Sequence, residues 1–146
     1  MPWPAAAFRE ALEWAKAHFP FDGRFDGHEQ MYEPMATTVA RYLAPGARIF
    51  DFGCGPCDKT AILSRMGYNC VATDDLNDHW HRQGDNRESI VAFARAAGID
   101  FRPASGDGAP QFAGGSFDML IMHDVLEHLH DSPRDLLNDC MMSLKD

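Results

Sequence analysis

The sequence has 146 residues with 13 basic and 22 acidic side chains, a formal net charge of −9 at pH 7. Apolar residues make up 45% and charged residues 24%, close to globular averages, which disfavours disorder, collagen and a coiled coil. No apolar run approaches the roughly 20 residues that cross a bilayer, and the acidic balance disfavours a nucleic-acid partner. Four cysteines, without the pattern of a signal peptide, indicate free thiols in the cytoplasm.

Two amphipathic helices are predicted before residue 46. Apolar residues recur at spacings of three and four within 4–18. A loop rich in Gly and Asp at 21–27 precedes a second helical pattern at about 28–43, which stops before Pro45-Gly46. We expect residues 1–45 to form a helical cap.

From residue 46 onward the pattern alternates between strands and helices. In chain order we expect a strand at 48–52, a helix at 60–66, a strand at 68–73, a helix at 86–97, strands at 99–101 and 117–122, and a helix at about 132–144. Hairpin signals are missing, so we predict an α/β, Rossmann-like fold. Its mostly parallel sheet would have about four strands in the order 3-2-1-4, with flanking helices and an N-terminal helical extension.

Two of the helix starts carry capping signals. Asp85 and Glu88 fit a capping box for the helix at 86–97. Ser132 fits the N-cap of the last helix, with Pro133 as its first residue.

Glycines and an acid stand where the first two predicted strands end. Gly53 and Gly55 follow the first strand, where glycine lets the backbone turn tightly and approach a ligand. Asp74 ends the next strand about 20 residues later, a spacing at which a carboxylate accepts hydrogen bonds from both ribose hydroxyls. These features predict a nucleoside site. A plain strand-to-helix turn with a capping aspartate is the alternative.

Four motifs in order resemble those of the class I S-adenosylmethionine-dependent methyltransferases. They are Ile49-Phe-Asp-Phe-Gly-Cys-Gly55, Asp74, Ala104-Ser-Gly-Asp-Gly-Ala-Pro110 and Gly115-Ser-Phe-Asp-Met-Leu-Ile-Met-His-Asp-Val-Leu-Glu-His128. The resemblance implies a cofactor-binding domain at 46–146 that uses S-adenosylmethionine, releases S-adenosylhomocysteine and methylates a small-molecule or sugar-containing acceptor.

The resemblance also implies a cofactor-binding role for residues at the carboxyl ends of the strands. In chain order these are Asp51, Gly53, Cys54, Gly55, Asp74, Asp75, Leu76, Asp107, Gly108 and His123. Asp51, Gly53 and Gly55 would shape the pocket for the methionine part, and Asp74 would hold the ribose. Asp75 and Leu76 would flank the adenine, and Asp107 would contact its amino group.

Cys57 departs from the family pattern and opens a rival interpretation. The family commonly has a third glycine there. A left-handed cysteine costs about 1–2 kcal/mol more than glycine, so we expect the Pro56-Cys57 turn to be reshaped. Cys54-Gly-Pro-Cys57 is also the dithiol oxidoreductase tetrapeptide, in which a helix N-terminus lowers one thiol pKa. Gly53 replaces the aromatic residue usual before the first cysteine, so we interpret both thiols as fillers of a cofactor loop.

Histidines are the candidates for a general base, which methyl transfer needs only for a weakly acidic hydroxyl. His123 and His128 follow the fourth strand, and His28 stands near Tyr32 on a helix that would cover the pocket. The structural alternatives are a packed His128 and a solvated His28 at a helix start.

The segment after the fourth strand contains a candidate metal cluster. Asp124-x-x-Glu127-His128 resembles the cluster of metal-assisted members of the superfamily, but we expect no metal; no Cys/His pair has structural zinc spacing.

The connection after Asp74 is long and contains Asp78-His-Trp-His81. Trp80 would cover the adenine, reach the acceptor or pack on the sheet edge; for the histidines we expect a solvated loop.

The family usually adds three strands after the helix that ends near Leu144. We therefore expect a truncated domain that lacks most of its acceptor half. Its open edge beside the fourth strand would invite a second copy, giving a homodimer. The alternative to an enzyme is a methyltransferase-like module that binds a nucleoside without turnover.

Overall fold

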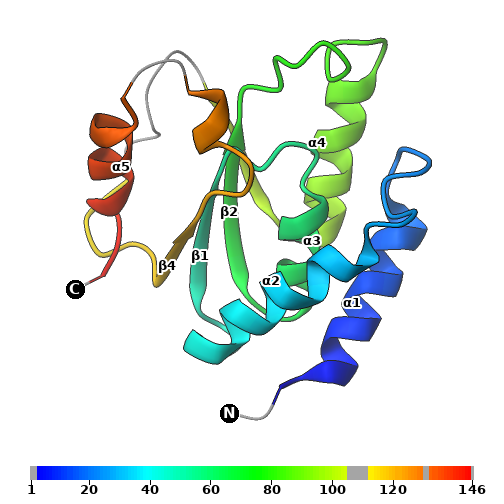
Figure 1. Cartoon of the computed structure of the whole chain (residues 1–146), viewed down its shortest axis with the longest axis horizontal. Helices are drawn as coiled ribbons and strands as arrows, with labels where there is room; N and C mark the ends of the chain where they lie inside the picture. Colours follow the sequence, from blue (N-terminus) through cyan, green and yellow to red (C-terminus); the bar gives the residue numbers. More distant parts are fainter. Residues whose placement is uncertain (1–2, 105–111, 130–131, 146) are drawn as a thin grey trace.

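A parallel four-stranded sheet forms the centre of the computed structural model, which describes residues 3–104, 112–129 and 132–145 (Figure 1). The strands are β1 (Arg48–Phe52), β2 (Asn69–Asp74), β3 (Asp100–Pro103) and β4 (Met119–Ile121). Their order is β3-β2-β1-β4, which confirms the predicted topology. The helices are α1 (Ala5–His18), α2 (Glu29–Tyr42), α3 (Asp58–Arg65), α4 (Asn86–Ala97), a 3-10 turn η1 (Leu126–His128) and α5 (Arg134–Met141).

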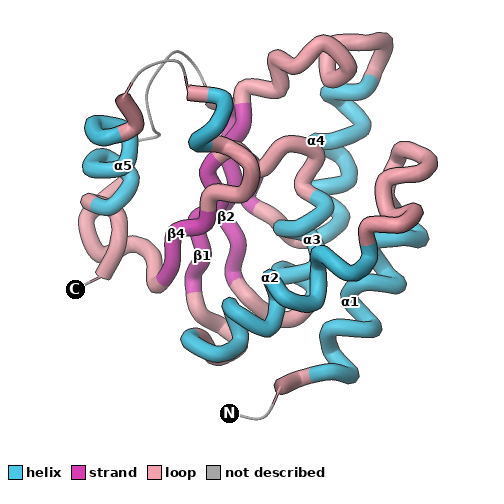
Figure 2. Tube along the Cα trace, viewed as in Figure 1, coloured by secondary structure: helices cyan, strands magenta, loops and turns pink. Residues whose placement is uncertain are grey.

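The strand register brings the loops of interest to one edge of the sheet. Phe50 in β1 stands opposite Val71 of β2 and Leu120 of β4, so these strands run side by side and in the same direction. All four strands end at the same edge, the side on which parallel sheets bind ligands. Figure 2 shows the loops after β1, β2 and β4 gathered there.

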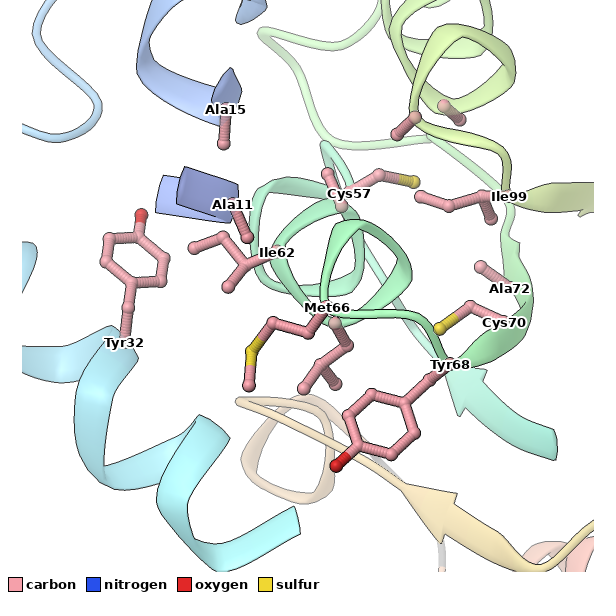
Figure 3. Close-up of a cluster of buried hydrophobic side chains, with 14 of the residues drawn as sticks. Ala11, Ala15, Tyr32, Cys57, Ile62, Met66, Tyr68, Cys70, Ala72 and Ile99 are labelled. Carbon is pink, nitrogen blue, oxygen red and sulfur yellow. The ribbon is translucent and has the colours of Figure 1, made fainter. Parts of the chain in front are cut away.

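The two faces of the sheet are covered unequally. Ile49 points to the face covered by α1 to α4, whereas its neighbour Phe50 points to the face covered by α5 (Figure 1). This alternation is the two-residue period of a strand. Figure 3 shows the larger core, in which Ile62 of α3 lies beside Ala11 of α1 and faces Tyr32 of α2.

Several predicted boundaries and caps are wrong. β4 is only three residues long, shorter than the strand predicted at 117–122. Phe117 lies outside it and makes a single bridge to Leu144. Asp85 has φ −101° and ψ 21°, outside the extended N-cap conformation, and its side chain makes no capping hydrogen bond. Pro133 occupies the N-cap position of α5 in place of Ser132.

Within the described ranges, no helix combines the length and apolar content needed to cross a membrane.

Candidate functional site

The loop after β1 is held against β2 by backbone hydrogen bonds. The amides of Gly53 and Cys54 donate to the Thr73 carbonyl at 2.8 and 3.1 Å. Gly53 has φ +74°, and a Cβ there would lie 2.4 Å from Cγ2 of Val125. A side chain at Gly53 would therefore be strained by its backbone and would collide with the segment after β4.

Asp74 joins the loop after β1 to the loop after β2. Its Oδ2 accepts a hydrogen bond from the Gly55 amide at 2.8 Å, and its Oδ1 accepts one from the Leu76 amide at 2.7 Å. A carboxylate offers about four lone-pair sites. Asp74 thus shapes both loops and retains acceptor capacity on each oxygen for a ligand.

Asp51 is a buried carboxyl at the centre of the site. Its Oδ2 accepts a hydrogen bond from the Thr60 hydroxyl at 2.5 Å, while its Oδ1 has no partner among the described residues. Burial raises the pKa of Asp51 to about 7, against the opposing effect of the Thr60 hydrogen bond. Asp51 therefore presents a polar atom with unused hydrogen-bonding capacity.

Cys57 keeps the conformation that favours glycine, so the expectation of a reshaped turn is wrong. It caps α3 with φ 65° and is completely buried. Its Sγ lies 3.4 Å from Sγ of Cys54. Burial raises the pKa of the Cys54 thiol well above its usual value, whereas dithiol catalysis needs an accessible thiol with a lowered pKa. The two cysteines therefore fit the interpretation as space-filling side chains of the loop better than that as a redox centre.

A cavity of about 900 Å³ opens at this edge of the sheet and gathers most of the predicted site residues. Those that line it are Asp51, Gly53, Cys54, Gly55, Asp74, Asp75, His123 and His128. Leu76 instead lines a neighbouring pocket of about 540 Å³, together with Asp74 and Asp75. Asp107 and Gly108 lie outside the described residues.

The two candidate bases differ in their surroundings. His123 follows β4, and its Nε2 is buried without a partner in the described part of the chain. Burial lowers the pKa of His123, and Lys59 lowers it further. His128 is exposed at the end of η1, and its backbone amide donates to the Val125 carbonyl at 3.0 Å. His123 is thus the more enclosed of the two side chains.

Asp58, which no motif had marked, connects the N-terminal segment to the site. It is 2% exposed at the start of α3. It accepts hydrogen bonds from the Tyr32 hydroxyl at 2.6 Å and from Nε and Nη2 of Arg24 at 3.0 and 3.3 Å. The carboxylate also sits favourably at a helix N-terminus. His28 is exposed at the start of α2, so Tyr32 rather than His28 makes this link.

The charges around the cavity are mostly negative and its cations are paired. Arg24 is bound to Asp58, and Lys59 lies 2.6 Å from Asp124. The aspartates that line the described part of the cavity are Asp51, Asp58, Asp74, Asp75, Asp78, Asp124 and Asp135. Across residues 3–104, 112–129 and 132–145, no group of three or more His, Cys, Asp or Glu side chains is arranged to hold a metal ion.

The loop after β2 contains a site residue that sequence reasoning missed. His81 lines the cavity and is 3% exposed, so the expectation of a solvated loop is wrong for this residue. Trp80 packs edge-on against Phe21 of the N-terminal segment, with ring centroids 5.3 Å apart. The unusual length of the loop was the available signal. No feature of the sequence distinguished the buried His81 from the exposed His79.

Comparison with known proteins places the chain in a family. Residues 50–146 match the family described as "Methyltransferase domain". Ubiquinone biosynthesis O-methyltransferases of Caulobacter vibrioides and Parvibaculum lavamentivorans are 28% and 31% identical over 109 and 98 residues. These matches cover 73% and 67% of this chain, but 40% and 36% of those proteins. The chain spans about two fifths of the length of these curated relatives.

Solved structures share the fold. PH0226 of Pyrococcus horikoshii has a TM-score of 0.63 at 20% identity, over 89% of this chain and 61% of its own. A SAM-dependent methyltransferase of Aquifex aeolicus has a TM-score of 0.62 at 16% identity, over 92% and 67%. The match over residues 50–146 and the sheet order together show that the chain belongs to the methyltransferase domain family, with the fold of the class I S-adenosylmethionine-dependent enzymes.

Proposed function

We propose that the cavity at the carboxyl edge of the sheet binds S-adenosylmethionine, and that the protein transfers its methyl group to a small-molecule acceptor, which includes sugar-containing ones. The observation that carries this proposal is the joint placement of the glycine loop and Asp74 around one cavity of about 900 Å³. A nucleoside site needs such a close backbone approach beside a carboxylate.

The residues of the site fit the parts of that cofactor. The free lone pairs of Asp74 suit the two ribose hydroxyls, and unpartnered Oδ1 of Asp51 suits the charged end of the methionine part. A Cβ on Gly55 would meet open space, so its bare backbone faces the cavity. We propose that Asp75 and Leu76 flank the adenine, with Asp107 and Gly108 beyond them.

His123 is the residue we propose as general base when the acceptor is a hydroxyl. S-adenosylmethionine supplies a methyl group already activated on a sulfonium sulfur, so the protein mainly aligns the acceptor with it. The lowered pKa keeps His123 neutral at pH 7, and a neutral imidazole can take the hydroxyl proton. His128, exposed at the rim, is the second candidate.

The paired cations restrict the acceptor. An anionic acceptor would compete with Asp58 for Arg24 or with Asp124 for Lys59, and would face the aspartates of the cavity. A neutral hydroxyl compound avoids both costs. The curated relatives are named as O-methyltransferases of ubiquinone biosynthesis, and we propose methylation of oxygen on this basis. A homodimer through the β4 edge stays a prediction.

Titration calorimetry tests the proposed function. The chain should bind S-adenosylmethionine and S-adenosylhomocysteine, and NAD much more weakly. Asp74→Ala should weaken the binding of S-adenosylhomocysteine by about 1–3 kcal/mol, because it removes the hydrogen-bond acceptor for the ribose and leaves the Gly55 amide without its partner. Asp100→Ala is the matched control, since Asp100 is exposed on β3 and bound to Arg102.

Two outcomes would contradict the proposal in different ways. A folded chain that binds neither S-adenosyl compound has no cofactor site of this kind. Binding by the chain, without methyl transfer by the full-length protein to any of a panel of neutral hydroxyl acceptors, would favour the nucleoside-binding module.

A further inference from the structure

His81 lines the cavity, and both of its ring nitrogens are buried without a partner in the described part of the chain. Its side chain is 3% exposed. Nδ1 lies 4.0 Å from Oδ2 of Asp78, which is too far for a hydrogen bond. Roughly nine in ten buried polar groups in folded proteins have a partner. Two such atoms on a cavity-lining ring therefore point to a ligand.

The ring is held in place by its neighbours. The Trp80 ring lies against it with centroids 4.1 Å apart, and Trp80 in turn packs against Phe21. The side-chain amide of Asn86, at the start of α4, donates to the Trp80 carbonyl at 2.6 Å. These contacts hold the His81 ring in one position beside the cavity, so the imidazole is oriented before a ligand binds.

The chemistry of the ring restricts that ligand. Burial lowers the pKa of His81, although Asp74, Asp78 and Asp75 act in the opposite direction and Arg87 reinforces burial. A neutral imidazole offers one N–H donor and one acceptor nitrogen. A hydroxyl group, which both donates and accepts, matches either nitrogen. His81 lines the same cavity as Asp74, the carboxylate proposed for the ribose, and belongs to the loop that follows Asp74. We therefore assign that hydroxyl to the nucleoside end of the cavity.

We propose that His81 is a specificity-determining residue of the nucleoside site and hydrogen-bonds a ribose hydroxyl of the bound S-adenosyl compound. This inference rests on the proposed function. It differs from the motif residues because His81 belongs to the long loop after β2, which no motif covers. The loop would thus contribute a second polar contact to the sugar that Asp74 holds.

The test measures binding of S-adenosylhomocysteine and of adenosine to the chain and its variants by calorimetry. His81→Phe keeps a ring in the core but removes both nitrogens. It should lower the affinity for both ligands about tenfold. His81→Asn, which retains a donor and an acceptor, should recover part of the loss. The matched control is His79→Phe, because His79 is exposed in the same loop and bonded to Gln83; it should leave binding unchanged.

Deoxy ligands locate the contact. Wild-type protein should bind either 2′-deoxyadenosine or 3′-deoxyadenosine about tenfold more weakly than adenosine, beyond any loss due to Asp74. His81→Phe should lose that extra discrimination. In long-range proton–nitrogen spectra, a ring nitrogen of His81 should shift on saturation with S-adenosylhomocysteine while those of His79 stay in place.

Unchanged affinity of a folded His81→Phe protein, or ring nitrogens that do not shift, would overturn the inference. A loss for S-adenosylhomocysteine without a loss for adenosine would also overturn it, since the contact would then lie on the amino-acid part. Failure of the wild-type chain to bind any S-adenosyl compound would instead count against the proposed function itself.

Discussion

The two sides of the cavity differ in how much apolar surface they bury. Up to Ala104, four helices pack on one face of the sheet and bury most of the core, and this side carries Asp51, Asp74 and His81. In the described residues from 112 onward, the buried side chains are those of Phe117, Ile121, Cys140 and Ser143. Leu126, Met141 and Met142 are exposed there. Apolar burial sets local stability. The part up to Ala104, where we propose that the cofactor binds (the cofactor side), is therefore better packed than the described residues from 112 onward, which carry the proposed base His123 (the acceptor side).

Matched truncations in the two cores give the largest expected contrast. Ile62 is completely buried in the core that α3 forms with α1 and α2, and Ile62→Ala should lower the free energy of unfolding by about 2–5 kcal/mol. Leu136 of α5 is only partly buried, so Leu136→Ala should cost about 1 kcal/mol. Urea unfolding curves measure both. Equal losses would show that the two sides are equally well packed.

The buried carboxyl of Asp51 should make the cofactor side lose stability as the pH rises from about 4 to 7. The pKa of Asp51 is about 7 in the folded chain and 3.8 when exposed, so the folded state binds its proton more tightly. The stability that this group contributes is complete below about pH 4 and is lost as the pH rises to 7. The loss amounts to roughly 2–4 kcal/mol.

Asp51→Asn removes that titration while it keeps the size of the side chain. Urea unfolding between pH 4 and 8 should show wild type losing stability relative to the variant as the pH rises. Asp118→Asn is the control on the other side. Because Lys145 lowers the pKa of Asp118, the contribution of this carboxylate is lost only below about pH 4, so the difference between wild type and this variant should stay constant between pH 4 and 8. A flat difference between wild type and Asp51→Asn would contradict the raised pKa.

Gly53 is the point at which the two sides touch. Gly53→Ala should cost about 1 kcal/mol for the left-handed backbone and about 1–2 kcal/mol more to displace Val125. Calorimetry should also show at least tenfold weaker S-adenosylhomocysteine binding. Gly46 has a φ of +92°, and a Cβ added there would meet open space. Gly46→Ala should therefore show the backbone cost alone and normal binding.

Adding Val125→Ala to Gly53→Ala separates the two contributions. The double variant should recover the collision cost and keep the backbone cost. No recovery would mean that Val125 moves aside freely, and that the acceptor side adapts to the cofactor side without penalty.

The contrast between the sides also explains what the sequence could predict. The glycine loop and Asp74 were predictable because they depend on local pattern and on spacing along the chain. The strand order was predictable because parallel strands with right-handed crossovers allow few arrangements. The Asp58 contacts to Arg24 and Tyr32 were not, because they join residues that are distant in the chain and that show no motif. Burial of His81 depends in the same way on Phe21 and Trp80, which meet only in the folded chain.

Cys57 shows a different limit. Its propensity argued for a reshaped turn, yet the residue keeps φ 65° because its thiol fills the core beneath the loop. Tertiary packing thus offsets a backbone cost of about 1–2 kcal/mol that is visible from sequence.

The Lys59–Asp124 ion pair bridges the two sides and should give the smallest effect. Nζ and Oδ2 are 2.6 Å apart, but the Asp124 side chain is 68% exposed, so the pair is worth less than about 1 kcal/mol and weakens with salt. Its effect on His123 is more informative. Lys59 lowers the pKa of His123 and Asp124 raises it, so Lys59→Met should raise that pKa and Asp124→Asn should lower it. An NMR titration of the His123 ring follows both variants, and shifts in the same direction would mean that altered burial, rather than these charges, sets the pKa of His123.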